Sequence, residues 1–255
     1  MKNIIIHGGI FLLLIFWCLA FIFGCKKDNS TAPNSSTAVS VSAKDYLNSS
    51  NYDKLVIQIQ YVNGYQPTSG AVDDLKTFLS QRLNKPAGVE VTYSNINSPG
   101  RTVYSLDDVK AVESLNRAVK TEGKTITAYV LFLDGDYSQN NGNLKTLGVA
   151  YSSSSMVIFE KTLRDLSGGL GQPTLGSVEA TVSEHEFGHI LGLVNNGTNM
   201  TVSHQDEPHG KHCNNSNCLM YYMTETSDMI SNLLGNNVPV LDANCINDLK
   251  ANGGK

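Results

Sequence analysis

The segment SEHEFGHILG, residues 183–192, decides the fold and the chemistry that this chain can support. It sets His185 and His189 four residues apart, with Glu186 directly after the first histidine. On an α-helix, residues four apart share a face, so both imidazoles can reach one metal ion while Glu186 reaches a water on that ion. The segment therefore predicts a helix that holds zinc through the two histidines, with Glu186 as general base. The alternative is a solvated helix face with two incidental histidines.

The chain before this helix alternates between runs typical of strands and runs typical of amphipathic helices. Ser105, followed by Asp108, has the pattern of a helix N-cap. Strands are expected at residues 55–62, 89–93, 126–133, 146–151 and 156–159, and helices at residues 72–83, 106–119 and 178–190. The last two strands are short and flank a Ser run, which predicts an antiparallel pair at a sheet edge. The order predicts an α+β domain, with a twisted mixed sheet beneath the metal-binding helix and a smaller C-terminal part after it.

The N-terminus has the pattern of an export signal. Lys2 precedes an almost wholly apolar stretch, residues 4–23, which ends in Gly24 and Cys25. A small residue before a cysteine at this point resembles the lipobox of bacterial lipoproteins, in which the cysteine becomes the lipid-bearing first residue of the mature chain. A plain membrane anchor is the alternative, because about 20 apolar residues can span a bilayer.

The lipoprotein resemblance implies three segments: a signal peptide at residues 1–24, a flexible polar tether at residues 25–45, and a folded domain at residues 46–255. We expect a protein of the bacterial cell envelope, anchored in a membrane by lipid on Cys25, at the outer membrane or the cell surface. The formal net charge is −4, with no basic stripe, which argues against a nucleic-acid partner.

A catalytic zinc normally has three protein ligands and an open position, so a third ligand must follow the helix. Gly192 lies three residues after His189, where a helix can end in a left-handed turn. This pattern resembles the metzincin metallopeptidases, in which the third histidine follows three residues after that glycine. Asn195 stands there instead, and asparagine is a poor zinc ligand.

Residues 212–220 read HC-x4-C-x-M, which resembles the stretch of archaemetzincins that carries the third ligand, a cysteine pair and the Met-turn. The simplest reconciliation is an inserted loop at residues 195–211, since loop insertions cost little entropy per added residue. The resemblance then implies His212 as third ligand. His209 and His204, both inside the insertion, remain alternatives.

The resemblance also implies roles for two residues near this point. Met220 would lie beneath the zinc as an apolar floor of the Met-turn. Tyr222 occupies the place where some metzincins carry a tyrosine that contacts the metal or the oxyanion. An ordinary core methionine and a core or rim aromatic are the alternatives.

Archaemetzincins bind a second, structural zinc through four cysteines, and this chain departs from that pattern. Apart from Cys25 and the leader, it has only Cys213, Cys218 and Cys245, so a four-cysteine site is excluded and a second structural zinc is not expected. In an oxidising compartment two of the three would form a disulfide, with the pairing undetermined. A three-cysteine zinc site with some other ligand is the alternative.

The resemblance implies a zinc metallopeptidase, most simply a metalloendopeptidase, with one catalytic Zn²⁺. Zinc would lower the pKa of its water, Glu186 would take the proton, and the metal, with Tyr222, would stabilise the oxyanion. The edge strand at residues 147–151 would pair with an extended substrate, so a peptide or protein is the expected partner.

Three other functions remain open. A gluzincin would take Glu225 as its third ligand. A non-enzymatic surface lipoprotein would keep the fold and the metal for binding alone. The site could also be intact but latent; residues 26–45 contain no cysteine, so a cysteine-switch propeptide is not expected.

Overall fold

The computed structural model describes residues 40–233 and 237–255 of the chain. The expected signal peptide, the lipid site Cys25 and most of the tether lie outside the described residues. Within the described part, no helix is both long enough and apolar enough to cross a membrane.

The centre of the fold is a five-stranded mixed sheet with the strand order β2-β1-β4-β7-β6. Its strands are β1 (Lys54–Val62), β2 (Val89–Ile96), β4 (Thr125–Phe132), β6 (Gly148–Ser152) and β7 (Ser155–Ile158). β1 pairs parallel with β2 and β4, and β4 pairs parallel with β7, whereas β6 runs antiparallel to β7 at the edge. The mixed sheet and its antiparallel edge pair are thus confirmed. Two further strands, β3 (Val103–Tyr104) and β5 (Asp136–Tyr137), form a separate small ladder.

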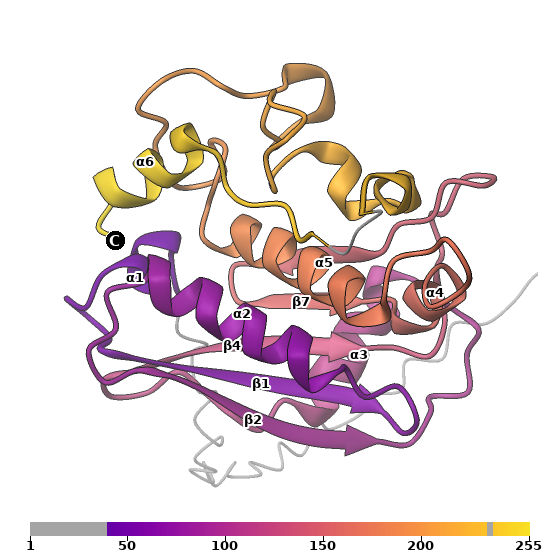
Figure 1. Cartoon of the computed structure of the whole chain (residues 1–255). Helices are drawn as coiled ribbons and strands as arrows, with labels where there is room; N and C mark the ends of the chain where they lie inside the picture. The colour runs from indigo at the N-terminus through magenta and orange to yellow at the C-terminus, as the bar shows by residue number, and fades with distance from the viewer. Residues whose placement is uncertain (1–39, 234–236) are drawn as a thin grey trace, which may run out of the picture. The chain divides into compact units, whose positions relative to one another are not determined.

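Helices cover both faces of this sheet, which explains why β1 and β4 are continuous apolar runs. On one face α2 (Ser69–Arg82) and α5 (Leu175–Ile190) lie side by side, and α3 (Leu106–Asn116) lies on the other (Figure 1). Alternate residues of β4 enter the two cores: Val130 joins the larger one under α2 and α5, and Leu131 the smaller one with α3.

Each of the long helices begins at a hydroxyl side chain that accepts a hydrogen bond from the first turn, which satisfies one orphan donor. Thr68 caps α2, Ser105 caps α3 and Thr174 caps α5. The capping box expected at Ser105 is present, since Asp108 accepts in return from the Ser105 backbone N–H at 2.9 Å.

The folded part begins ahead of the boundary expected at residue 46. Helix α1 (Ala43–Leu47) is capped by Ser42, and Val41 and the α1 side chains Tyr46 and Leu47 are buried. The buried ammonium of Lys85 donates to the carbonyls of Asp45 (2.7 Å), Asn48 and Tyr52 (2.6 Å). A polar stretch that looked like tether is therefore fixed by a lysine distant in sequence, which no local pattern reveals.

The expected smaller C-terminal part follows α5 and lies on the side of that helix away from the sheet (Figure 1). It is mostly irregular, because its residues lack the periodicity of helices or strands. Its short elements are η1 (Glu207–His209), η2 (Tyr222–Glu225), η3 (Ser227–Leu233) and α6 (Ala243–Ala251). One further short helix, α4 (Glu160–Asp165), precedes α5.

We predict that Lys85→Met lowers the free energy of unfolding by about 2–4 kcal/mol, because it leaves three backbone carbonyls without their donor. Urea unfolding measures the change. The control is Lys44→Met on the exposed side of α1, which should change the free energy by less than about 0.5 kcal/mol. Equal effects of the two substitutions would show that the Lys85 hydrogen bonds do not fix α1.

Candidate metal centre

Helix α5 presents the two histidines of the opening motif and ends where the sequence predicted. Gly192 has φ +74°, the left-handed conformation expected of a terminating glycine. A Cβ there would lie 2.7 Å from both the Thr198 backbone nitrogen and the Ala43 Cβ, so no other residue fits without movement. The chain therefore reverses at Gly192 and passes back toward the helix.

His185, His189 and His212 meet at one point. The Nε2 atoms of His185 and His189 lie 3.2 Å apart, and the His212 ring stacks on His185 with centroids 5.3 Å apart. One ligand atom from each histidine, together with a carboxylate oxygen of Glu225, lies within 4.8 Å of all the others. The structure thus brings His212 to the two helical histidines.

Hydrogen bonds orient two of these rings. Nδ1 of His185 lies 2.7 Å from the Leu219 carbonyl, and Nδ1 of His212 lies 2.6 Å from the His209 carbonyl. A carbonyl only accepts, so each Nδ1 carries the hydrogen and each Nε2 presents a lone pair in the neutral ring. His212 Nε2 is buried without a hydrogen-bond partner in the described part of the chain. An orphaned imidazole nitrogen facing two others fits a zinc ion.

The surroundings of His189 favour the neutral form of its ring, which can bind a metal ion. Burial, and then the neighbouring His185 and His212, hold the pKa of His189 well below its usual value. A neutral imidazole is the form that donates to a metal.

Glu225 joins the three histidines from η2. Its Oε2 lies 3.5 Å from His212 Nε2 and 3.8 Å from His185 Nε2. Although burial acts against it, these histidines hold the pKa of Glu225 below its usual value, so it is a carboxylate. The two alternatives for a third ligand, His212 and Glu225, are therefore both present at the site.

Glu186 is held by the edge strand. Its Oε2 accepts a 2.6 Å hydrogen bond from the backbone N–H of Ala150 on β6, and its Oε1 is buried without a partner among the described residues. Burial and the nearby Glu225 raise the pKa of Glu186. A Cβ on Gly148 would lie 2.7 Å from Val182 and 2.9 Å from Glu186, so a glycine lets β6 approach the helix.

Met220 packs against α5 at Gly188, the residue directly before His189. A Cβ on Gly188 would lie 2.3 Å from the Met220 sulfur, and Met220 is fully buried. The Met220 carbonyl accepts a 2.7 Å hydrogen bond from the backbone N–H of Cys213, next to His212. This contact fits the floor role expected for Met220.

Tyr222 and His209 contact each other. Their rings stack with centroids 3.6 Å apart and an angle of 3°. His209 is exposed, and its Nδ1 lies 2.7 Å from Asp206 Oδ2. The structure therefore places His209 away from the ligand set of His185, His189, His212 and Glu225, and sets Tyr222 against the loop.

The insertion at residues 195–211 returns to its starting point. Lys211 Nζ donates to the Asn195 carbonyl at 2.8 Å, and Asn195 Nδ2 donates to Gln205 at 3.2 Å. Asn195 itself is exposed. The ends of the loop thus lie together, which is the geometry that delivers His212 in place of Asn195.

Cys213, Cys245, His204 and Asp242 each bring one ligand atom within 4.8 Å of the others. Cys218 adds its thiol, with Sγ close to that of Cys245. The three cysteines and His204 are here called the thiol cluster. All four side chains are buried, and all three cysteines are free. The Sγ atoms of Cys218 and Cys245 are 3.7 Å apart, far beyond a disulfide bond of about 2.05 Å. The expected disulfide is therefore absent, because the three thiols gather around a fourth polar group rather than pair.

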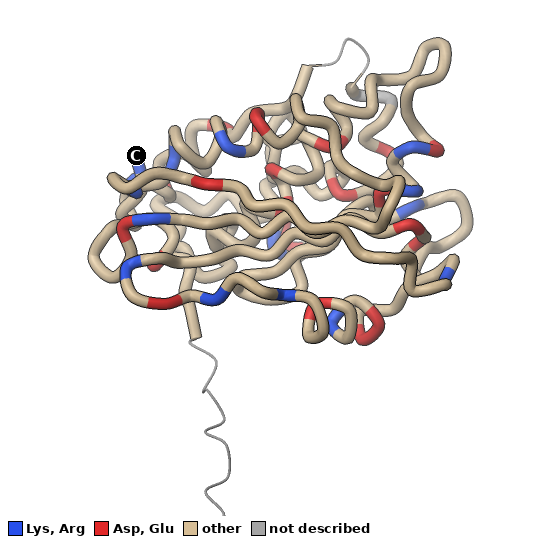
Figure 2. Tube along the Cα trace, turned by 90° about the horizontal axis from the view of Figure 1, so that it is seen from below, with Lys and Arg blue, Asp and Glu red and all other residues tan. Residues whose placement is uncertain are grey.

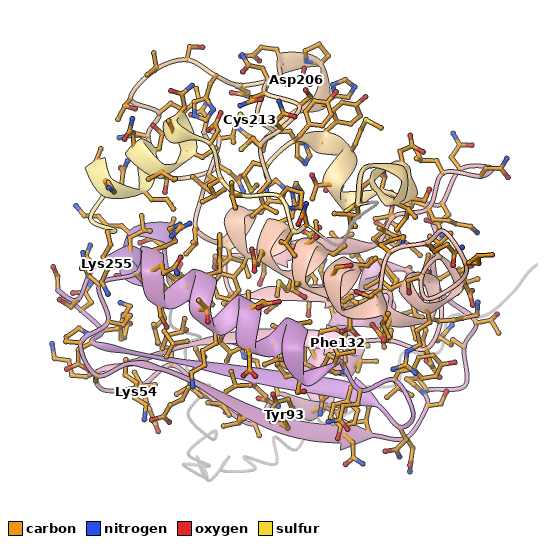
Figure 3. All side chains as sticks on the ribbon, in the orientation of Figure 1. Lys54, Tyr93, Phe132, Asp206, Cys213 and Lys255 are labelled. Atoms are coloured by element: carbon orange, nitrogen blue, oxygen red, sulfur yellow. The ribbon has the colours of Figure 1, made fainter. Side chains whose placement is uncertain are left out.

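His204 belongs to the thiol cluster and not to the centre on α5. Its Nδ1 lies 3.4 Å from Cys213 Sγ, and its Nε2 lies 2.7 Å from Asp248 Oδ2. Asp248 Oδ1 is held in turn by the N–H (2.6 Å) and hydroxyl (2.8 Å) of Thr201. Cys213 lies beyond α5 as seen from the sheet (Figure 3). The sequence did not predict that His204 joins the cysteines, because it showed only that His204 lies in the inserted loop.

Comparison with known proteins gives structural similarity only. No protein-family model and no curated protein matches the chain. Archaemetzincin from Methanopyrus kandleri is 18% identical, with a TM-score of 0.49 over 80% of this chain and 96% of its own. A zinc-dependent peptidase from Methanocorpusculum labreanum is 14% identical, with a TM-score of 0.46 over 76% and 99%. Metalloproteinase-II from Bacteroides fragilis is 14% identical, with a TM-score of 0.44 over 87% and 58%.

We predict that His212→Ala removes about one equivalent of zinc per chain, since two helical histidines alone hold zinc weakly. His209→Ala is the matched control from the same loop and should keep the wild-type zinc content. Elemental analysis after dialysis measures both. Zinc retained in His212→Ala but lost in Glu225→Ala would instead identify Glu225 as the third ligand.

Proposed function

We propose that this chain is a zinc-dependent peptidase of archaemetzincin type, most simply a metalloendopeptidase. The observation that carries the proposal is the convergence of His185, His189 and His212 beside the buried carboxylate of Glu186. Three imidazoles and an adjacent acid are the parts that metal-assisted hydrolysis requires.

In the proposed reaction the two oxygens of Glu186 have different tasks. Zinc, when bound, would lower the pKa of a coordinated water and polarise the scissile carbonyl. Oε2 of Glu186 stays on the Ala150 N–H, which fixes the side chain, and Oε1 is free to take the proton of the attacking water. Glu186 then returns that proton to the leaving amine.

The proposed substrate is an extended peptide that lies along β6. This strand is at the edge of the sheet and has β7 as its only strand neighbour in the described part of the chain. An extended peptide adds to such an edge through backbone hydrogen bonds. Ala150 is on the same strand and holds Glu186, so the peptide would lie beside the general base. Tyr222 is retained as a candidate oxyanion contact.

We propose that the domain works at the bacterial cell envelope, tethered by lipid on Cys25 after removal of residues 1–24. Lys and Arg are interspersed with Asp and Glu over the described chain (Figure 2), which argues against a nucleic-acid partner. A surface lipoprotein that binds zinc without hydrolysis is the alternative, and hydrolysis assays over peptide libraries separate the two.

We further propose that the thiol cluster holds a second, structural zinc, contrary to the expectation from the sequence. Zinc bonds of about 2.3 Å to sulfur and 2.0 Å to nitrogen set tetrahedral ligands roughly 3.5–3.8 Å apart. The 3.7 Å separation of Cys218 from Cys245 and the 3.4 Å separation of His204 from Cys213 agree with this spacing. Asp248 on the outer nitrogen of His204 is the usual partner of a metal-bound imidazole.

The expected zinc content is therefore two per chain, and Cys245→Ser should lower it to about one by breaking the thiol cluster. Thiol titration of the unfolded protein, without reductant, should find Cys213, Cys218 and Cys245 all reduced. One zinc in the wild type together with one disulfide would exclude the second site.

Glu186→Gln should keep both zinc ions but lose about 10²–10⁴-fold in kcat, because an amide cannot take the proton. Peptide hydrolysis with an internally quenched library measures kcat. Glu184→Gln, two residues earlier on the same helix, is the control and should keep most of the activity. Full activity in Glu186→Gln would show that Glu186 is not the general base.

A further inference from the structure

The carboxylate of Glu225 lies as close to the histidine nitrogens as a further ligand of the same metal ion would. In a tetrahedral zinc site with bonds of about 2.0–2.1 Å, any two ligand atoms are roughly 3.3–3.4 Å apart. Nε2 of His185 and Nε2 of His189 are 3.2 Å apart, and Glu225 Oε2 is 3.5 Å from His212 Nε2 and 3.8 Å from His185 Nε2. The carboxylate oxygen thus lies close to the spacing expected of a fourth ligand, and all four ligand atoms lie within 4.8 Å of one another.

Glu225 faces the ring nitrogens of His185 and His212 that a metal ion would use, and without a metal it raises the pKa of His212 against the effect of burial. The Nδ1 hydrogens of His185 and His212 are given to backbone carbonyls, so in the neutral rings the nitrogens that face Glu225 carry lone pairs. A carboxylate oxygen set against two lone pairs is repelled unless a positive charge, either a ring proton or a metal ion, lies between them. Glu186 adds a second buried carboxyl to the same space. A metal cation bound by the three histidines and Glu225 would supply this positive charge.

Glu225, like His189, is partly exposed, so it has a route to solvent. Its side chain is 32% exposed, whereas that of His185 is fully buried and that of His212 is 10% exposed. Its backbone carbonyl accepts a 2.8 Å hydrogen bond from Leu147, directly before β6, and Thr226 forms a bridge with Thr146. The carboxylate therefore extends from a segment joined to the start of the strand along which the peptide would lie.

Four protein ligands leave no open position, which is the arrangement of structural zinc sites and not of catalytic ones. We propose that Glu225 is a fourth, displaceable ligand that closes the metal centre at rest and gives up its place when substrate arrives along β6. This inference rests on the proposed peptidase function. It makes the resting enzyme partly latent without a propeptide, with the displacement of one carboxylate as the step that opens the site.

The test uses the protein with cobalt in place of zinc, because the visible absorption of Co²⁺ reports its ligands. The probes are sodium azide and a peptide hydroxamate. Removing a ligand should weaken the affinity for Zn²⁺, measured against a competing chelator, by at least about tenfold in Glu225→Ala. The same variant should bind azide and hydroxamate at least about tenfold more tightly than the wild type, since no carboxylate must leave.

Two variants keep the test decisive. Glu225→Gln retains the side-chain shape and should shift both affinities in the same directions by a smaller factor, because an amide oxygen is a weaker ligand. Glu207→Gln, an exposed acid on the neighbouring loop, is the control and should leave both unchanged. Near-ultraviolet circular dichroism of each variant confirms the fold.

Azide binding to the wild type as tight as to Glu225→Ala would overturn the inference, as would an unchanged affinity for Zn²⁺ in both Glu225 variants. Peptide hydrolysis is read separately. A Glu225→Ala protein that binds azide tightly but cleaves no peptide would support Glu225 as a ligand and count against the proposed peptidase.

Discussion

Three imidazoles, the buried carboxyl group of Glu186 and the partly exposed carboxylate of Glu225, gathered around one point, form the constraint on which the rest of the structure depends. Charged and polar groups gathered in a protein interior are costly unless they satisfy one another or bind an ion. The backbone fixes three of them by separate contacts: carbonyls of Leu219 and His209 orient two rings, and the N–H of Ala150 on β6 holds Glu186. Close approaches at Gly148 and Gly188 bring the sheet edge and Met220 against the helix. The site is therefore organised by backbone as much as by side chains.

The two candidate metal groups are joined through a single peptide bond. His212 faces the histidines of α5, and the next residue, Cys213, faces the thiol cluster. Because Cys213 lies against His204 of the insertion and near Cys245 of α6, the cluster fixes the same short segment that carries His212. Metal in the thiol cluster would then add to the order that the irregular C-terminal part gains by burying Leu219, Leu241 and Leu249 in the larger core.

The sequence predicted the features that arise from local periodicity and close spacing. The Val- and Ile-rich runs became β1 and β4, the Ser105 capping box began α3, and the His185–His189 spacing placed both rings on one face. Features made by distant contacts could not be predicted in this way. Lys85 fixes α1, Asp248 directs His204 to the thiols, and Leu147 positions Glu225. His212 falls between these cases, because a motif indicated it but only the closed insertion loop brings it to α5.

The contact between Ala43 and Gly192 links the N-terminal segment to the end of the metal-binding helix. If the chain is tethered through Cys25 as proposed, proteolytic shedding would have two different results. A cut ahead of Val41 would release a domain in which α1 still covers the turn after His189. A cut after Asn48 would release a domain without α1, with Gly192 uncovered and the Lys85 ammonium deprived of two of its three carbonyls. Release with α1 and release without it are thus separated by a few residues of chain, and the position of the cut decides which occurs.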